Sequence, residues 1–228
     1  NLNFLQTFLS KAVYLISIGS NDYFAPFTSN SSLCKSHSHR EYVGLVIGNL
    51  KKVIKGIYTK GGRKFGVASV VSLGCLPGTR AYNSENTDAC VEQITEVAKL
   101  HNRQLAKALL KLKRQRHGFK YSNPNLYNYI NERIEHPSKF GFKEGKVACC
   151  GSGQYRGIDS CGGKRGVTEY ELCDNVSEYV YFDSGHPTER VYQRVSKLKF
   201  RQKCGLISFF NQLRILHTKL LFKNKFMV

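Results

Sequence analysis

Two continuous apolar runs, both rich in β-branched residues, predict strands buried in a sheet. The first, AVYLISI, spans residues 12–18 and ends at Gly19, and the second, FGVASVVSLG, spans residues 65–74. Runs that are apolar at nearly every position, rather than at every second one, are typical of strands covered on both faces in a parallel sheet. We therefore predict two strands of a mainly parallel sheet.

Helical spacing of apolar residues appears between the two runs and again after the second. From Val43 to Ile57 apolar side chains recur every three or four positions, and Gly61 and Gly62 follow as a C-terminal cap. A second amphipathic helix is predicted from about residue 90 to residue 113, with Asp88 as its candidate N-cap. The predicted order of elements along the chain is therefore strand, helix, strand, helix.

This alternation predicts an α/β fold, with helices packed on both faces of the sheet and sites at the carboxyl ends of its strands. The segment FKYSNPNLY at residues 119–127 can supply a further short strand. Two polar segments follow predicted strand ends, GSND at residues 19–22 and GCLPGTRAYN at residues 74–83. These segments are where we expect functional side chains.

The chain has 228 residues, of which 41% are apolar, and this composition predicts one globular domain. We assign it to residues 1–197, and residues 198–228 to a divergent basic C-terminal tail. No apolar run is long enough to predict a transmembrane segment. Because the chain opens on Asn1 and its one methionine is Met227, we expect a fragment of a longer product.

The formal charge of +19 raises the question of a nucleic-acid partner. Nine of the 35 basic residues fall between Arg194 and Lys225 with no acid among them, and the rest are scattered. Since no recognition motif accompanies the charge, we expect no nucleic acid and interpret the cations as a solvated surface. The tail keeps helical spacing, so a basic amphipathic surface helix remains an alternative there.

Eight cysteines are many for a cytosolic chain of this length. They are Cys34, Cys75, Cys90, Cys149, Cys150, Cys161, Cys173 and Cys204. Adjacent Cys149 and Cys150 do not fit the spacing of zinc ligands, so we expect no metal and predict disulfides in a secreted, extracellular protein. At least two are expected within the set Cys149, Cys150, Cys161 and Cys173. Candidate glycosylation sites at Asn30 and Asn175 agree with secretion.

The segment YVYFDSGHPTER at residues 179–190 places Asp183 three residues before His186. A carboxylate at that spacing can accept a hydrogen bond from the imidazole Nδ1–H, which leaves Nε2 free to take a proton from a hydroxyl group. The alternative is a structural or solvated histidine.

The GSND segment supplies a second candidate element. Gly19 permits a tight turn at the end of the strand, and the side-chain NH₂ of Asn21 can point at a developing oxyanion. The structural alternative is an Asx turn that closes the strand.

Four segments, in this order, resemble the plant GDSL esterase/lipase family, a branch of the SGNH hydrolases. They are AVYLISIGSNDYF, HNRQLAKALLKLK, HPSKFGFKEGKVACCGSG and EYVYFDSGHPTERVYQ. The resemblance covers roughly residues 5–196. It implies a three-layer α/β/α, flavodoxin-like fold that here lacks its first strand–helix unit.

By this resemblance, the family's oxyanion-hole asparagine falls on Asn21, and its catalytic base and orienting acid fall on His186 and Asp183. We expect Asn21 and His186 to face one cleft at the carboxyl edge of the sheet. The family's nucleophilic serine belongs to a Gly-Asp-Ser block that this chain lacks. We therefore expect the nucleophile upstream of Asn1, together with a signal peptide, and interpret Ser17, Ser20, Ser152 and Ser184 as strand, turn and loop residues.

Two functions remain open. The first is hydrolysis of lipid or other carboxylic esters by a Ser-His-Asp mechanism without a cofactor. The second is a catalytically inactive secreted relic or binding protein, which the missing block favours. The sequence does not fix the natural ester or the oligomeric state.

Overall fold

A computed structural model describes residues 2–28, 37–83, 89–163 and 166–197. Its main sheet has three parallel strands in the order β1-β2-β3, formed by Val13–Ile16, Lys64–Val67 and Lys120–Ser122. Val13 pairs with Lys64, and Lys64 in turn pairs with Lys120. The predicted parallel sheet is confirmed, although its strands are shorter than the apolar runs.

The expectation that residues 12–18 are covered on both faces is wrong for part of the run. Leu15 is 50% exposed and Ile18 is 54% exposed, whereas Ile16 is buried. β1 is also an outer strand of the described sheet, so only one of its backbone edges is paired there. The second run also leaves the sheet early, since the chain after Val67 turns into the 3₁₀ helix η1, Leu73–Cys75.

Helix α4, His39–Thr59, connects β1 to β2 and begins at a capping box. The Ser38 hydroxyl accepts from the Glu41 N–H at 3.3 Å, and the Glu41 carboxylate accepts from the Ser38 N–H at 2.8 Å. At the other end the Gly62 N–H donates to the Ile57 carbonyl at 3.0 Å, which confirms the predicted glycine cap. The apolar side of α4 is buried in the core.

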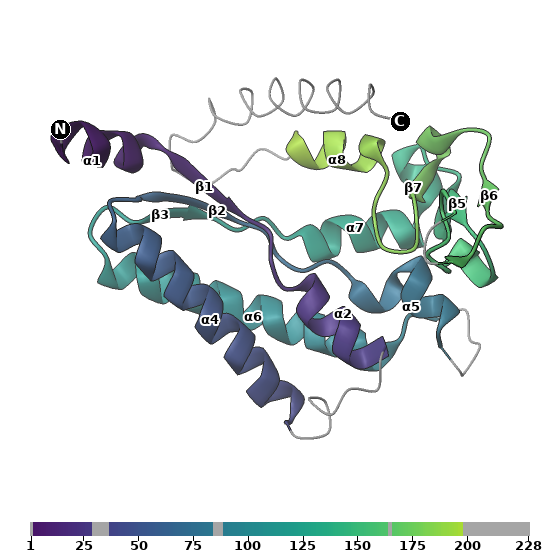
Figure 1. The fold of residues 1–228 in the computed structure, drawn as a ribbon, viewed down its shortest axis with the longest axis horizontal. Helices are drawn as coiled ribbons and strands as arrows, with labels where there is room; N and C mark the ends of the chain where they lie inside the picture. Colours follow the sequence, from purple (N-terminus) through teal and green to yellow (C-terminus); the bar gives the residue numbers. More distant parts are fainter. Residues whose placement is uncertain (1, 29–36, 84–88, 164–165, 198–228) are drawn as a thin grey trace.

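Helix α6, Glu92–Gln115, is longer than α4 and also buries its apolar side. It buries Ile94, Val97, Leu105, Leu109 and Leu112, and it packs beside α4 on one side of the sheet (Figure 1). Its N-cap is Val91, without a side-chain cap, so the prediction of Asp88 was wrong. Asp88 itself lies outside the described residues.

The remaining elements surround this sheet. Helices α1, Leu2–Lys11, and α2, Ser20–Thr28, flank β1, and α5, Pro77–Ala81, follows η1. Next come α7, Leu126–Glu135, and the 3₁₀ helix η2, Pro137–Phe140. Strand β4, Glu144–Ala148, pairs in parallel with β7, Tyr179–Tyr181, and β5, Cys150–Gly151, pairs antiparallel with β6, Glu171–Leu172.

The region of the short strand pairs also contains two 3₁₀ helices, η3 at Gln154–Arg156 and η5 at Val176–Glu178. The last described helix is α8, Glu189–Ser196. In Figure 1, α4 and α6 lie on one side of β1–β3 and α8 lies on the other. This arrangement of helices around mostly parallel strands, with no closed barrel in the described part, agrees with a three-layer α/β/α fold. No helix in this part is long and apolar enough to cross a membrane.

Candidate functional site

Asp183 and His186 meet on the loop that follows β7. The imidazole Nδ1 lies 2.8 Å from Asp183 Oδ1 and 3.0 Å from Oδ2. Asp183 Oδ1 also accepts the backbone N–H groups of Gly185 at 3.0 Å and His186 at 2.8 Å. The carboxylate is therefore oriented by three donors, while the imidazole side chain is 75% exposed.

Main-chain bonds hold this loop in place from both sides. The Phe182 N–H donates to the His186 carbonyl at 2.8 Å, which closes the loop on itself. The Cys150 N–H donates to the Phe182 carbonyl at 2.7 Å, and the Gly78 N–H donates to the Ser184 carbonyl at 2.8 Å. The loop is thus attached both to the β4–β5 segment and to helix α5.

Asn21 lies in the first turn of α2, two residues after Gly19, and its side chain is exposed. Gly19 has φ +127°, and a Cβ added there would lie 3.0 Å from His101 Cε1 and 3.0 Å from Val70 Cγ2. Only glycine fits this close approach without strain. The predicted tight turn at Gly19 is therefore present, and it sets the direction in which α2 begins.

A buried histidine, which the sequence analysis did not assign to the site, supports this turn. His101, on α6, is fully buried, and its Nδ1 lies 2.6 Å from the Tyr23 hydroxyl on α2. Burial lowers the pKa of His101 to about 4 and raises the pKa of Tyr23. The imidazole is therefore neutral near pH 7, and its Nδ1 shares one hydrogen bond with the Tyr23 hydroxyl.

The other side of α2 is held by α4. The Tyr42 hydroxyl donates to the Asp22 carbonyl at 2.9 Å, and the Tyr42 and Tyr23 rings meet edge to face, with centroids 6.1 Å apart. The turn that carries Asn21 is thus held in place by contacts with both α4 and α6. A histidine on the apolar face of a helix, in the HNRQL segment, was the sequence signal for this support.

The turn at Gly19 and the Asp183 loop are linked through the segment after β2. Val70, which packs against Gly19, is held at its N–H and its carbonyl by the amide of Asn102, each at 2.8 Å. The same segment leads into α5, whose Gly78 bonds to Ser184. Because β1 and β2 are parallel neighbours, both segments emerge at one edge of the sheet.

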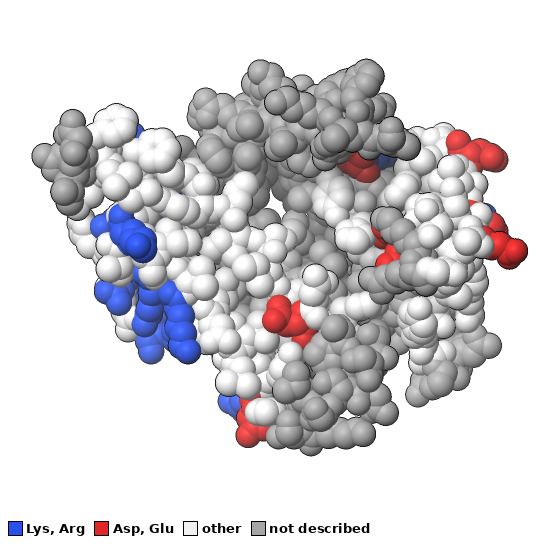
Figure 2. Space-filling view, viewed as in Figure 1, with Lys and Arg blue, Asp and Glu red and all other residues white. Residues whose placement is uncertain are grey.

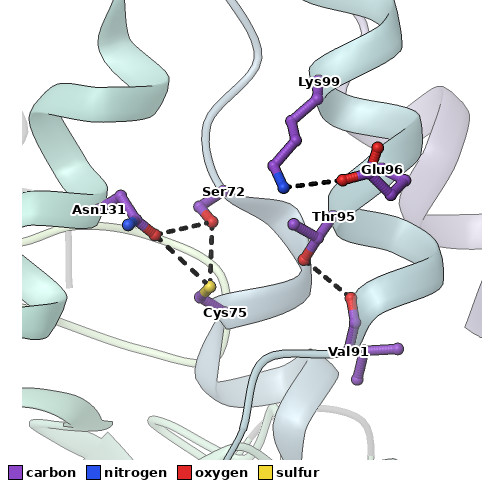
Figure 3. Close-up of polar contacts among 7 residues, drawn as sticks. All are labelled: Ser72, Cys75, Val91, Thr95, Glu96, Lys99 and Asn131. Atoms are coloured by element: carbon purple, nitrogen blue, oxygen red, sulfur yellow. Dashed lines mark hydrogen bonds and ion pairs between the residues drawn. The ribbon is translucent and has the colours of Figure 1, made fainter.

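Several of the described serine hydroxyls are bonded to groups other than His186. Ser152 and Ser160 share a hydrogen bond of 2.8 Å. Buried Ser72 faces Cys75 and donates to the Asn131 amide oxygen at 3.2 Å (Figure 3). Within the described ranges, the His186 ring contacts are those to Asp183, and no serine hydroxyl is bonded to it.

Three disulfides are formed in the described chain, and two of them join the cysteines that were expected to pair among themselves. The pairs are Cys75–Cys90, Cys149–Cys173 and Cys150–Cys161. Successive residues of an extended segment point to opposite sides, so adjacent cysteines take different partners. Cys34 and Cys204 lie outside the described residues.

Of the two candidate glycosylation sites, Asn175 is described and is exposed. It caps the short helix η5, where its side-chain oxygen accepts from the Ser177 N–H at 3.1 Å and from the Ser177 hydroxyl at 2.7 Å. Asn30 lies outside the described residues. In the described part of the chain, no group of three or more His, Cys, Asp or Glu side chains is arranged to hold a metal ion.

Comparison with known proteins gives this geometry a context. The family model for GDSL-like lipase/acylhydrolase matches residues 6–198. The chain is 48% identical over 190 residues to GDSL esterase/lipase 5 and 44% identical over 191 residues to GDSL esterase/lipase 1, both of Arabidopsis thaliana. Each alignment covers 83% of this chain, and 49% and 51% of the respective relative.

A further relative from the same plant is named Inactive GDSL esterase/lipase-like protein 25. It is 36% identical over 189 residues, which cover 83% of this chain and 43% of that protein. The chain therefore spans about half the length of the curated relatives it matches. The extent of the family match and these identities together show that the chain belongs to the GDSL-like lipase/acylhydrolase family.

Proposed function

We propose that this chain carries the base, acid and oxyanion-binding elements of a secreted esterase that cleaves lipid-type carboxylic esters by a Ser-His-Asp mechanism. The observation that carries the proposal is the contact of His186 Nδ1 with an Asp183 carboxylate that two backbone N–H groups also hold. Such a carboxylate fixes the tautomer in which Nε2 is unprotonated. Nε2 can then accept a hydroxyl proton and later donate it to the leaving alcohol.

The chemistry needs a nucleophile and an oxyanion site as well. Attack of a serine oxygen on the ester carbonyl gives a tetrahedral intermediate, whose negative oxygen the Asn21 NH₂ group would stabilise. Collapse expels the alcohol, and water then releases the acid from the acyl-enzyme by the same route. Asp183 holds the imidazolium that forms in both steps.

We infer that the nucleophile comes from a Gly-Asp-Ser block outside these 228 residues. The support is indirect: the sequence has no such block, and in the described residues no serine hydroxyl is bonded to the His186 ring. The chain also matches only about half of its relatives' length. Secretion is proposed with the enzyme, because three disulfides and plant relatives agree with an oxidising compartment.

A second candidate is a secreted binding protein without catalysis. It is favoured by the likeness to a relative that is named inactive. The two candidates differ in whether the gene product hydrolyses an ester.

The test compares the 228-residue chain with the same chain extended upstream through a Gly-Asp-Ser block, both assayed on short-chain p-nitrophenyl esters. We expect turnover from the extended chain only. His186→Ala and Asp183→Asn should each lower its kcat, the second by about 10⁴-fold through the wrong imidazole tautomer.

Each alternative result has a definite meaning. Turnover by the 228-residue chain that His186→Ala abolishes would show that a serine within it is the nucleophile. A correctly folded extended chain without turnover on esters of several acyl lengths would favour the binding protein.

A further inference from the structure

The outer side of the α4–α6 layer carries a row of cations on each helix. On α4, Lys51 and Lys55 follow Ile47 at intervals of four, and on α6, Arg103, Lys107 and Lys111 follow one another at the same interval. Residues four apart lie on one face of a helix. Together with Lys52 and Arg114, these five lysine and arginine residues form what we call the basic face.

The basic face has almost no neutralising acid in the sequence of its two helices. Residues 42–60 and 97–120 contain no Asp or Glu, and Glu96, just before the second stretch, is paired with Lys99 at 2.7 Å (Figure 3). On the side drawn in Figure 2, Lys and Arg gather over α4, away from the acidic side chains. The positive potential of this surface is therefore largely uncompensated.

A groove between the two helices adds an apolar component. It encloses about 580 Å³ and is lined by Arg40, Ile47, Leu100, Arg103, Gln104, Lys107 and Ala108. Three of these side chains are cations, none is acidic, and Ile47, Leu100 and Ala108 supply the aliphatic part of the lining.

Aliphatic side chains are also exposed among the cations. Leu45 is 52% exposed and lies seven residues before Lys52, and Leu110 is 41% exposed and lies four residues before Arg114. Both spacings put the aliphatic and the basic residue on the same side of the helix. Binding of a soluble polyanion would leave such exposed leucines in water, whereas binding at a membrane interface would bury them in the lipid.

We propose that the basic face binds the surface of an anionic phospholipid membrane. Lysine and arginine would lie at the level of the phosphate groups, and Leu45 and Leu110 would enter the boundary between headgroups and acyl chains. The proposal does not depend on catalysis, since none of these residues belongs to the Asp183 loop or to the Asn21 turn.

The experiment measures binding of the 228-residue protein to vesicles by cosedimentation. One set is phosphatidylcholine alone, and the other contains about 30 mol% phosphatidylserine. We expect binding to the second set only, weakened when NaCl is raised to about 0.5 M. Equal binding to both sets, or binding to neither, would overturn the proposal.

Two triple variants locate the surface. Arg103→Gln/Lys107→Gln/Lys111→Gln removes three charges from the basic face, and Lys139→Gln/Lys146→Gln/Lys197→Gln removes three charges elsewhere. At about fivefold per cation near the membrane, the first should weaken binding by up to roughly 150-fold, and the control should bind nearly as wild type. Because both variants retain residues 198–228, equal losses in the two would assign the binding to the tail or to net charge and reject the basic face.

Substitution of Leu110 separates a membrane from a soluble polyanion. Leu110→Gln keeps every charge, so it should weaken vesicle binding several-fold and leave binding to heparin unchanged. Tight heparin or RNA binding, combined with vesicle binding that Leu110→Gln does not alter, would assign the face to a polyanion instead. Circular dichroism of each variant checks that the fold is kept.

Discussion

The backbone N–H of Gly78 donates to the carbonyl of Ser184, so helix α5 is bonded directly to the loop between Asp183 and His186. The two chain segments are about a hundred residues apart in sequence. A Cβ added at Gly78 would lie 3.1 Å from the Ser184 carbonyl oxygen and 3.3 Å from the Gly157 carbonyl oxygen. The lack of a side chain at Gly78 allows the two backbones to approach this closely.

We predict that Gly78→Ala destabilises the protein by about 1–3 kcal/mol, because the added methyl group pushes against main-chain atoms that cannot rotate away. The free energy of unfolding in urea measures this effect. Gly185→Ala is the matched control, since a Cβ at Gly185, on the same loop, would meet nothing within 4 Å. Equal losses in the two variants would show that the contact of α5 with the loop is unimportant.

A second prediction concerns Asn21 in the extended, active chain. Asn21→Asp keeps the shape of the side chain but replaces its NH₂ donor with an oxygen, so kcat should fall at least about 10²–10³-fold. Stability should not fall, because the side chain is exposed and a carboxylate in the first turn of a helix is favourable. Kinetics and urea unfolding are measured on the same sample.

The control for this change is Asn49→Asp, the same substitution at an exposed position of α4. It should leave kcat unchanged. If Asn21→Asp also left kcat unchanged, Asn21 would be a structural turn residue and would have no role in the oxyanion hole.

The helices were the most predictable part of the fold, because their signals are local. The recurrence from Val43 to Ile57 and the Gly61–Gly62 cap lie within the element they specify. The extent of the strands was less predictable, because an apolar run does not say how far neighbouring backbones accompany it. Residues 68–74 are apolar for a different reason: they form the buried segment that carries Val70 and η1.

The site was predictable where its residues are close in sequence and hidden where they are not. Asp183 and His186 need only a short loop to meet, so their spacing predicted the contact, whereas their roles are expected from the family resemblance. His101 was missed because its partners, Tyr23 and Gly19, are about eighty residues away. The pairings of the disulfides depend on distant backbone in the same way, so the sequence indicated only the set.

The third prediction concerns those disulfides. Cys149→Ser/Cys173→Ser should lower the free energy of unfolding by roughly 2–4 kcal/mol, because the bridge closes a loop of 24 residues next to the Asp183 loop. Val53→Ser, at a position of α4 that is 51% exposed, is the control and should have little effect. Mass mapping of the unreduced protein checks the pairs, and a Cys149–Cys150 or Cys149–Cys161 peptide would contradict the structure.

The last prediction concerns His101 and the pH dependence of stability. Burial lowers the pKa of His101 to about 4, whereas an unfolded histidine titrates near 6.5. Between these two values the unfolded chain binds a proton that the folded chain does not, so the stability that His101 contributes is present above pH 6.5 and is lost as the pH falls toward 4. The loss should be on the order of 3 kcal/mol.

In His101→Gln, which has no such proton to bind, the free energy of unfolding should fall less steeply over this range, and the gap between wild type and variant should narrow as the pH is lowered. Urea unfolding at several pH values measures both curves. If the His101→Gln and wild-type curves stayed parallel, His101 would titrate alike in both states and could not be the buried neutral support of the Asn21 turn.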